Sequence, residues 1–147
     1  LLAAEAPTGV SMVRDYDPSL PRLRLDRNRV IQALLNLGRI SIQAVGGSGR
    51  IVLRTRALTN ASIGSRRYRV VAAIQVEDDG PGVPSELKDT MFYPLVTGRQ
   101  GGTGLGLAVA QDLVGRHDGL IEFDSRPGRT VFTILLPFDS HELIENA

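Results

Sequence analysis

The stretch Gln100–Ala110, QGGTGLGLAVA, decides the fold of this chain. Four glycines precede an apolar run of helical spacing, and they stand at Gly101, Gly102, Gly104 and Gly106. Glycine lets a backbone approach a ligand closely, and the first N–H groups of a helix have no partner within that helix. A glycine-rich loop that leads into a helix therefore predicts a site for a phosphate chain. A flexible loop before a buried helix is the alternative that this stretch alone leaves open.

The spacing of these glycines differs from the common phosphate-binding motifs. A P-loop needs Gly-Lys-Ser/Thr, but the only lysine of the chain, Lys88, follows Leu87. The dinucleotide fingerprint needs a glycine where the chain has Leu107 or Val109. The His-Arg-Asp and Asp-Phe-Gly motifs of eukaryotic protein kinases are also absent.

Length and composition indicate a single globular domain of 147 residues. The net charge of +1 gives no reason to expect nucleic acid as a partner. The chain has no cysteine, which excludes disulfides, and no apolar run approaches the ~20 residues that a membrane span needs. We therefore expect a cytoplasmic protein that binds neither nucleic acid nor membrane. Because the chain lacks both a signal peptide and an initiator Met, we expect a fragment of a longer protein.

Hydrophobic periodicity predicts an α+β fold, with a frayed segment at 1–8, one domain at 9–139 and a tail at 140–147. Asp26 is the predicted N-cap of a long helix that ends near Val45. The apolar run Val70–Ile74 predicts a central strand. The expected strands are 10–15 (an edge strand), 51–56, 68–76, 120–125 and 130–136. A short helix is expected at 84–89, a third helix at about 104–117, and a polar turn at 60–65. This order predicts a layer of helices on one sheet.

Asp78 lies just beyond the predicted central strand, in the segment Asp78–Gly82. Its carboxylate is suited to accept a hydrogen bond from an adenine amino group, and Gly80 and Gly82 would let a flat ring lie against the backbone. A strand-ending turn, closed by a bond from the Asp side chain to the backbone, explains the same residues. Both interpretations stay open from this segment alone.

The long helix carries a polar strip, formed by Gln32, Asn36 and Gln43 with Arg39 beside them. Carboxamides can ligate a hard cation such as Mg²⁺ that phosphates also hold. A solvated helix face is the simpler explanation for the two glutamines. Ile40 interrupts the strip one turn after Asn36, where a binding strip would have a polar group.

Neither histidine is expected to act in catalysis. His117 ends a predicted helix before Asp118-Gly119, where a cation suits the helix dipole. His141 lies in the tail.

Three blocks in this order resemble the nucleotide-binding boxes of sensor histidine kinases. Asn36-Leu37 resembles the N box, Asp78–Gly82 the G1 box and Gly102–Gly106 the G2 box, while Phe92-Tyr93-Pro94 resembles the F box. The segments TMFYPLVTGRQGGTGLGL and RRYRV are similar to the nitrogen-regulation (NtrB-type) kinases. The joint match covers nearly the whole chain and is specific, whereas a single box is not.

The resemblance implies a Bergerat fold, a two-layer α/β sandwich in which three helices cover a mixed five-stranded sheet. It implies ATP as the ligand, with Asp78 on the adenine amine and Gly80 and Gly82 shaping that pocket. The implied phosphate contacts come from the backbone of the G2 box, and Phe92 belongs to the same site. Arg39 or Arg99 would add charge near the γ-phosphate. The implied phosphate-binding residues are Gly102, Thr103, Gly104, Leu105 and Gly106.

The N box departs from the family pattern N-L-x-x-N-A. The family's second Asn is the Mg²⁺ ligand, and this chain has Ile40 at that position, which leaves Asn36 as the one amide of the pair. Losing one such contact costs about 1–3 kcal/mol, or roughly 10- to 100-fold in Mg-ATP affinity. Ser41 follows but points about 100° away around the helix. We expect the fold to be kept and nucleotide handling to be weakened.

The chain also lacks the family's His-Glu-x-x-Asn/Thr-Pro block. The resemblance thus implies a separate dimerisation domain that carries the phosphoacceptor histidine, a response regulator of the NtrC type, and a P-II-type signalling protein as partners. Three functions stay open: a histidine kinase domain, a degenerate domain that only binds a regulatory protein, and an ATPase. Asn36 disfavours the ATPase, since that branch has a Glu there and a carboxamide is no general base.

Overall fold

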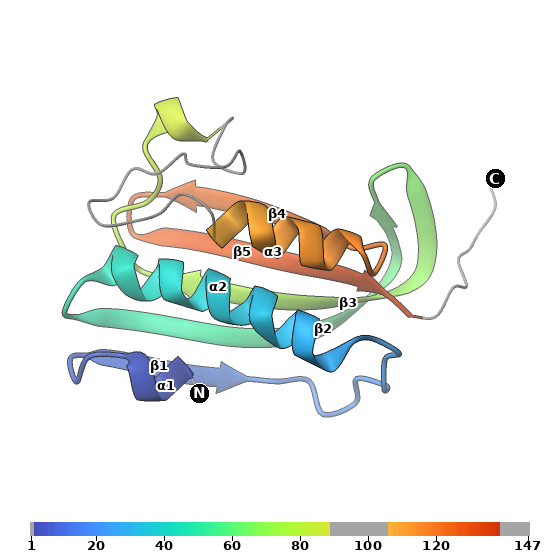
Figure 1. Cartoon of the computed structure of the whole chain (residues 1–147), viewed down its shortest axis with the longest axis horizontal. Coiled ribbons are helices and arrows are strands. Elements are labelled where there is room, and N and C mark those ends of the chain that lie inside the picture. Colours follow the sequence, from blue (N-terminus) through green and yellow to red (C-terminus); the bar gives the residue numbers. More distant parts are fainter. Residues whose placement is uncertain (1, 89–105, 139–147) are drawn as a thin grey trace.

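The computed structural model describes residues 2–88 and 106–138, which form one mixed sheet with helices on a single face (Figure 1). The sheet has five strands in the order β1-β2-β3-β5-β4. β1 pairs in parallel with β2, and the other neighbours are antiparallel. The strands are β1 (Val10–Asp15), β2 (Gly49–Ile63), β3 (Arg66–Asp78), β4 (Leu120–Arg126) and β5 (Arg129–Pro137). The expected α+β fold with a mixed five-stranded sheet is confirmed.

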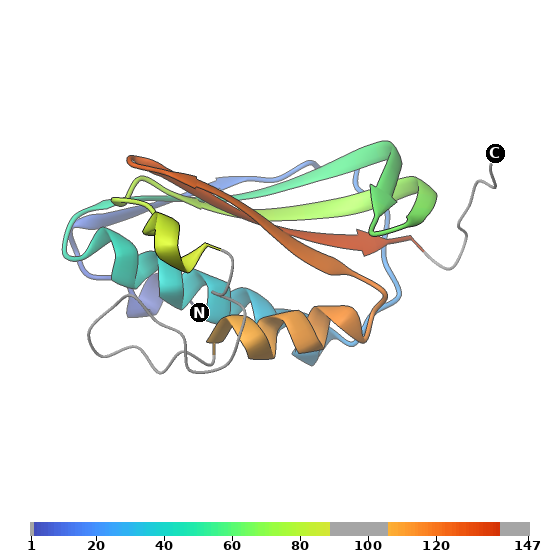
Figure 2. The same cartoon turned by 90° about the horizontal axis from the view of Figure 1, so that it is seen from above.

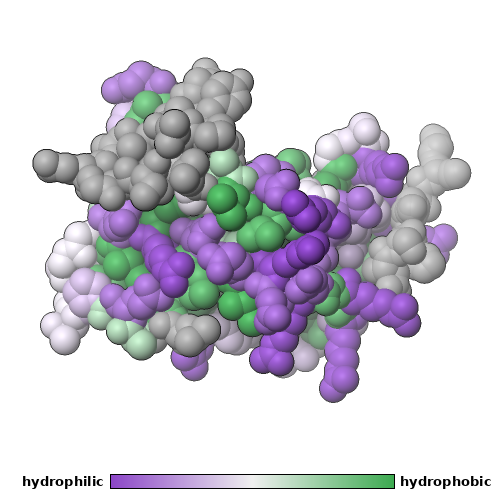
Figure 3. Space-filling view, in the orientation of Figure 1, coloured by the Kyte–Doolittle hydropathy of each residue, from purple (hydrophilic) through white to green (hydrophobic). Residues whose placement is uncertain are grey.

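The helix layer consists mainly of α2 (Arg27–Val45) and α3 (Gly106–Gly115). Figure 2 shows both helices on the same side of the sheet. A short helix α1 (Leu2–Glu5) packs against α2, and a 3₁₀ turn η1 (Ser85–Leu87) follows β3. The outward surface of this layer is mixed, with small hydrophobic patches over α2 and the start of α3 among hydrophilic side chains (Figure 3).

Helix α2 begins and ends where the sequence predicts. The Asp26 side chain accepts a hydrogen bond from the Arg29 N–H at 3.2 Å, and Gly46 ends the helix with a φ of 68°. Val30, Ala33 and Leu37 are buried at helical spacing and join the core that the sheet provides. The periodicity of these apolar residues therefore fixes which side of α2 faces the sheet.

Strand β3 is central, as its apolar run predicts, and lies between β2 and β5. Val71, Ala72, Ala73 and Val76 are at most 2% exposed. Successive side chains of a strand point to opposite faces, so Ala72, Val76 and then Asp78 share the helix side. The end of β3 thus delivers a carboxylate to the helix layer.

Two stretches differ from the expected elements. The polar turn expected at 60–65 is shorter, because β2 runs to Ile63 and only Gly64 and Ser65 form the turn. The composition had suggested a loop, but Ala61, Ser62 and Ile63 pair with Tyr68, Arg67 and Arg66 of β3. Of the three helices expected, the one at 84–89 is the 3₁₀ turn η1 in its described part.

The N-terminal segment contains α1, which packs against α2, and fraying of residues 1–8 stays a prediction. Leu2 is 9% exposed and occupies the space beside Gly38, where a Cβ would overlap the Leu2 side chain. Gly38 thus has a packing role that offsets its cost in the middle of a helix. The boundary expected at 139/140 lies outside the described residues.

The uncovered face of the sheet carries ion pairs across its strands. The Arg56 guanidinium lies 2.8 Å from an Asp15 carboxylate oxygen, and Glu77 lies 3.2 Å from both Arg54 and Arg129. These pairs join β1, β2, β3 and β5 on the side without helices.

In the described part of the chain, no helix is long and apolar enough to cross a membrane.

The contact between α1 and α2 predicts a non-additive pair of substitutions. In a Leu2→Ala background, Gly38→Ala should stabilise the chain by about 1 kcal/mol, the helix-propensity gain over glycine. In the intact chain the gain should be smaller, because the new methyl overlaps Leu2. Urea unfolding of the four variants in the cycle measures this difference. Equal gains in both backgrounds would show that Leu2 does not occupy the space beside Gly38.

Candidate nucleotide site

The buried carboxylate of Asp78 marks one end of the site. Asp78 is 2% exposed, and its Oδ1 accepts a hydrogen bond from the Gly80 N–H at 2.9 Å. This bond from the backbone to the Asp side chain closes the strand-ending turn that the sequence offered as one explanation of the segment. The alternation of side chains along β3 places this carboxylate on the helix side of the sheet.

The two glycines of the turn pack too closely against backbone for a larger residue. A Cβ on Gly80 would lie 3.0 Å from the Ala44 carbonyl oxygen of α2. Gly82 has a φ of 90°, and its Cβ would lie 2.8 Å from the Arg126 carbonyl oxygen of β4. The segment Asp78–Gly82 is therefore fitted between the end of α2 and the β4–β5 hairpin.

Helix α2 presents Asn36 and Ile40 to the start of α3. The Asn36 Nδ2 donates to the Gly106 carbonyl at 3.3 Å, and its Oδ1 accepts from Gln32 Nε2 at 2.9 Å. Among the described residues, the Ile40 side chain lies 3.6 Å from where a Cβ on Gly106 would stand. Asn36 and Ile40, one helical turn apart, thus flank the point where the glycine-rich segment enters its helix.

The residues present fit Mg²⁺ poorly on the α2 side. Ile40 offers no donor atom, which leaves Asn36 Oδ1 as the amide oxygen beside it; this oxygen accepts one hydrogen bond from Gln32 and has one further lone pair. Ser41 does not replace them, because it is fully buried on the sheet side of the helix. Within residues 2–88 and 106–138, no group of three or more His, Cys, Asp or Glu side chains is placed to hold a metal ion.

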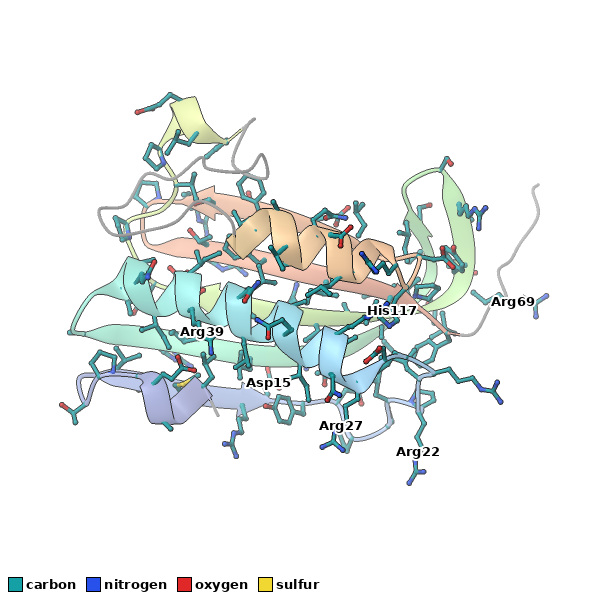
Figure 4. The ribbon with its side chains drawn as sticks, viewed as in Figure 1. Asp15, Arg22, Arg27, Arg39, Arg69 and His117 are labelled. Atoms are coloured by element: carbon teal, nitrogen blue, oxygen red, sulfur yellow. The ribbon has the colours of Figure 1, made fainter. Side chains whose placement is uncertain are left out.

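Arg39 lies on the side of α2 that faces α1, away from Gly106 (Figure 4). Its guanidinium donates to both carboxylate oxygens of Glu5, at 3.0 and 3.2 Å. The hydrogen bond from Arg39 lowers the pKa of Glu5, so this pairing is present above the ordinary pKa of a Glu and is lost as the pH falls through the lowered value. The phosphate-binding role of Arg39 stays a prediction.

His117 joins the two long helices far from Asp78. Its Nε2 accepts from the Asp26 N–H at 2.9 Å, which leaves Nδ1 as the protonated nitrogen, 3.0 Å from the Leu113 carbonyl. In Figure 4 His117 lies where α3 ends beside the beginning of α2. Both ring nitrogens serve the packing of helices, in line with the structural role expected from its position.

The remaining predicted site residues lie outside the described residues. They are Phe92, Arg99, Gly102, Thr103, Gly104 and Leu105. Of the G2 box, Gly106 alone is described, and it contacts α2 as set out above. The described part therefore brings together Asp78, Gly80, Asn36, Ile40 and Gly106 around the C-terminal half of α2.

The family model for histidine kinase-, DNA gyrase B- and HSP90-like ATPases matches residues 25–140. The chain belongs to this family. The match covers α2, the turn after β3 and the start of α3, the segments that meet in the structure.

Relatives in this ATPase family include sensor kinases. The chain is 51% identical to the sensory histidine kinase/phosphatase NtrB of Escherichia coli O157:H7 over 93% of its length, and 42% identical to NtrB of Rhodobacter capsulatus over 90%. It spans only 40% and 38% of those proteins. The catalytic domain of the histidine kinase ThkA superposes with a TM-score of 0.73 at 28% identity, over 88% of this chain and 80% of that one. The mycobacterial kinase MprB shares the fold, with a TM-score of 0.76 at 20% identity over 93% and 88%.

The site predicts that restoring an amide at position 40 strengthens the dependence of ATP binding on Mg²⁺. Calorimetric titration with a non-hydrolysable ATP analogue, with and without Mg²⁺, should show a gain of roughly 10- to 100-fold in Mg²⁺-dependent affinity for Ile40→Asn. Ile40→Leu is the matched control, since it keeps an apolar side chain at the same position. Strong and equal Mg²⁺ dependence in all three proteins would contradict the assignment of Ile40 to the metal position.

Proposed function

We propose that this chain is the catalytic ATP-binding domain of a sensor histidine kinase of the nitrogen-regulation type. The observation that carries the proposal is the convergence of Asp78 and its glycine turn with α2 and the first residue of α3. Gly80 packs against Ala44, and Asn36 bonds to Gly106, so one helix links both ends of the site. The similarity to NtrB over 93% of the chain supports the choice within the family.

The residues at the two ends of the site have different parts in the proposed binding of ATP. Asp78 supplies a buried acceptor for the amino group of adenine, and Gly80 and Gly82 let the turn that follows it fit between the end of α2 and the β4–β5 hairpin. The N-terminus of α3, beginning at Gly106, supplies N–H groups and the positive end of a helix dipole for the phosphates. Mg²⁺ would neutralise charge on the phosphates, and on the α2 side Asn36 would be the residue to hold it, because Ile40 offers no donor atom.

The proposed reaction moves the γ-phosphoryl of ATP to a histidine on a separate dimerisation domain. The bond from phosphorus to the β–γ bridging oxygen breaks, a bond to an imidazole nitrogen forms, and ADP leaves. Asn36 supports transfer to a protein over hydrolysis, because a carboxamide cannot take a proton from water. A cytoplasmic location, an NtrC-type response regulator as the next acceptor and a P-II-type regulator belong to the same proposal.

A second function is favoured by Ile40. An apolar side chain against Gly106 suits a degenerate domain that binds nucleotide weakly and acts through contacts with its dimerisation domain or a regulatory protein. The acid and the glycines of the turn, all in place, favour the enzyme. Phosphorylation separates the two functions directly.

The kinase proposal predicts label transfer that depends on Asp78. With γ-labelled ATP and a separately expressed phosphoacceptor domain, the chain should place acid-labile label on histidine. Asp78→Asn should lower ATP affinity roughly 10- to 100-fold, since the amide replaces a charged acceptor. Asp79→Asn is the control: this neighbouring carboxylate is exposed and accepts instead from the Arg50 N–H at 2.9 Å.

The outcomes of this experiment separate the two functions. Label on histidine that is lost in Asp78→Asn and kept in Asp79→Asn supports the kinase. ATP binding without any label transfer supports the degenerate domain. Equal ATP affinity in the chain and in Asp78→Asn would remove Asp78 from the site.

A further inference from the structure

The turn after Asp78 is held by the β4–β5 hairpin as well as by α2. The Gly128 N–H donates to the Gly80 carbonyl at 2.9 Å, and the Val83 N–H donates to the Ser125 Oγ at 2.8 Å. Between these two bonds, Gly82 lies against the Arg126 carbonyl. The hairpin is far from the turn in sequence, yet it contacts the turn along its whole length.

Ser125 is the side chain at the centre of this contact. It is 6% exposed and pairs across the hairpin with Thr130, which is 4% exposed. The two hydroxyl oxygens share a hydrogen bond of 2.7 Å, which fixes the Ser125 rotamer that receives the Val83 N–H. The Ser125 carbonyl also accepts from Lys88 Nζ at 2.8 Å, so both ends of the segment Val83–Lys88 are tied to one residue.

We propose that Ser125 is a positioning residue for the base-binding end of the site. It acts through the turn: by receiving the Val83 N–H, it sets the path of Gly80–Val83 and thereby the space beside the Asp78 carboxylate. Removing the hydroxyl leaves a part-buried N–H without its acceptor and frees the turn to shift. Recognition of the adenine amino group depends on that placement, because a hydrogen bond weakens steeply with misalignment. This role rests on the proposed function, in which Asp78 binds adenine.

The consequence is a loss of base discrimination that is distinct from a general loss of stability. ATP has the 6-amino group that Asp78 is proposed to accept from, and inosine triphosphate does not. A site that pairs with a substrate N–H discriminates strongly against the analogue that lacks it. If Ser125 positions the turn, its loss should reduce affinity for ATP and leave affinity for inosine triphosphate nearly unchanged.

The test measures both nucleotides by calorimetry on the chain, on Ser125→Ala and on Thr133→Val. Ser125→Ala should lower the preference for ATP over inosine triphosphate by about 10-fold. Thr133→Val removes another hydroxyl from the same hairpin, one that accepts from Gln75 Nε2 at 3.2 Å, and should keep the preference. Lys88→Met removes the Nζ contact alone and should shift the preference in the same direction by a smaller factor.

Each outcome decides a different statement. An unchanged ratio of the two affinities in Ser125→Ala, with ATP still bound, overturns the positioning role and leaves the proposed function standing. If Ser125→Ala does not fold, Ser125→Cys, which keeps the size of the side chain and replaces the hydroxyl by a weak acceptor, decides in its place by the same ratio. No ATP binding by the unaltered chain overturns the proposed function and the positioning role with it. If that unchanged ratio comes with an equal drop in both affinities, the role of Ser125 is purely structural.

Discussion

The packing of α2 on β3 is the constraint on which the candidate site depends. Leu37 is fully buried in the core cluster that also includes Val76 of β3, and its burial sets the rotation of the helix. At about 100° per residue, a helix held at Leu37 carries Asn36 and Ile40 on one flank. That flank meets α3 at Gly106. The chemistry offered to a ligand is therefore decided by an apolar contact on the other side of the helix.

Much of this arrangement could be predicted from the sequence, because its signals are local or periodic. Each signal lies within the element that it predicts. Examples are the Asp26 cap and the apolar spacing of α2, and the unbroken apolar run of β3. The grouping of Asn36, Asp78 and the glycine-rich segment came from the joint resemblance of three blocks to one family. A single block does not predict which other segments of the chain lie beside it in space.

The contacts that the sequence did not predict lie between elements distant in the chain. Ser125 and Thr130 carry ordinary strand-end residue types, and nothing local indicates that one of them receives the Val83 N–H. Nothing local in the sequence indicates that Leu2 packs in the space beside Gly38. The turn expected at 60–65 was shorter because pairing with β3 outweighs the polar composition of β2.

Because Arg39 pairs with Glu5 of α1, any anion that binds this arginine competes with the docking of α1. The guanidinium donates through two of its nitrogens to one carboxylate, so it cannot serve an incoming phosphate in the same geometry. By thermodynamic linkage, the factor by which α1 docking lowers the affinity for the anion equals the factor by which the bound anion lowers the equilibrium constant for α1 docking. The first residues of the chain are thus a competing ligand for Arg39, covalently attached and present at high effective concentration.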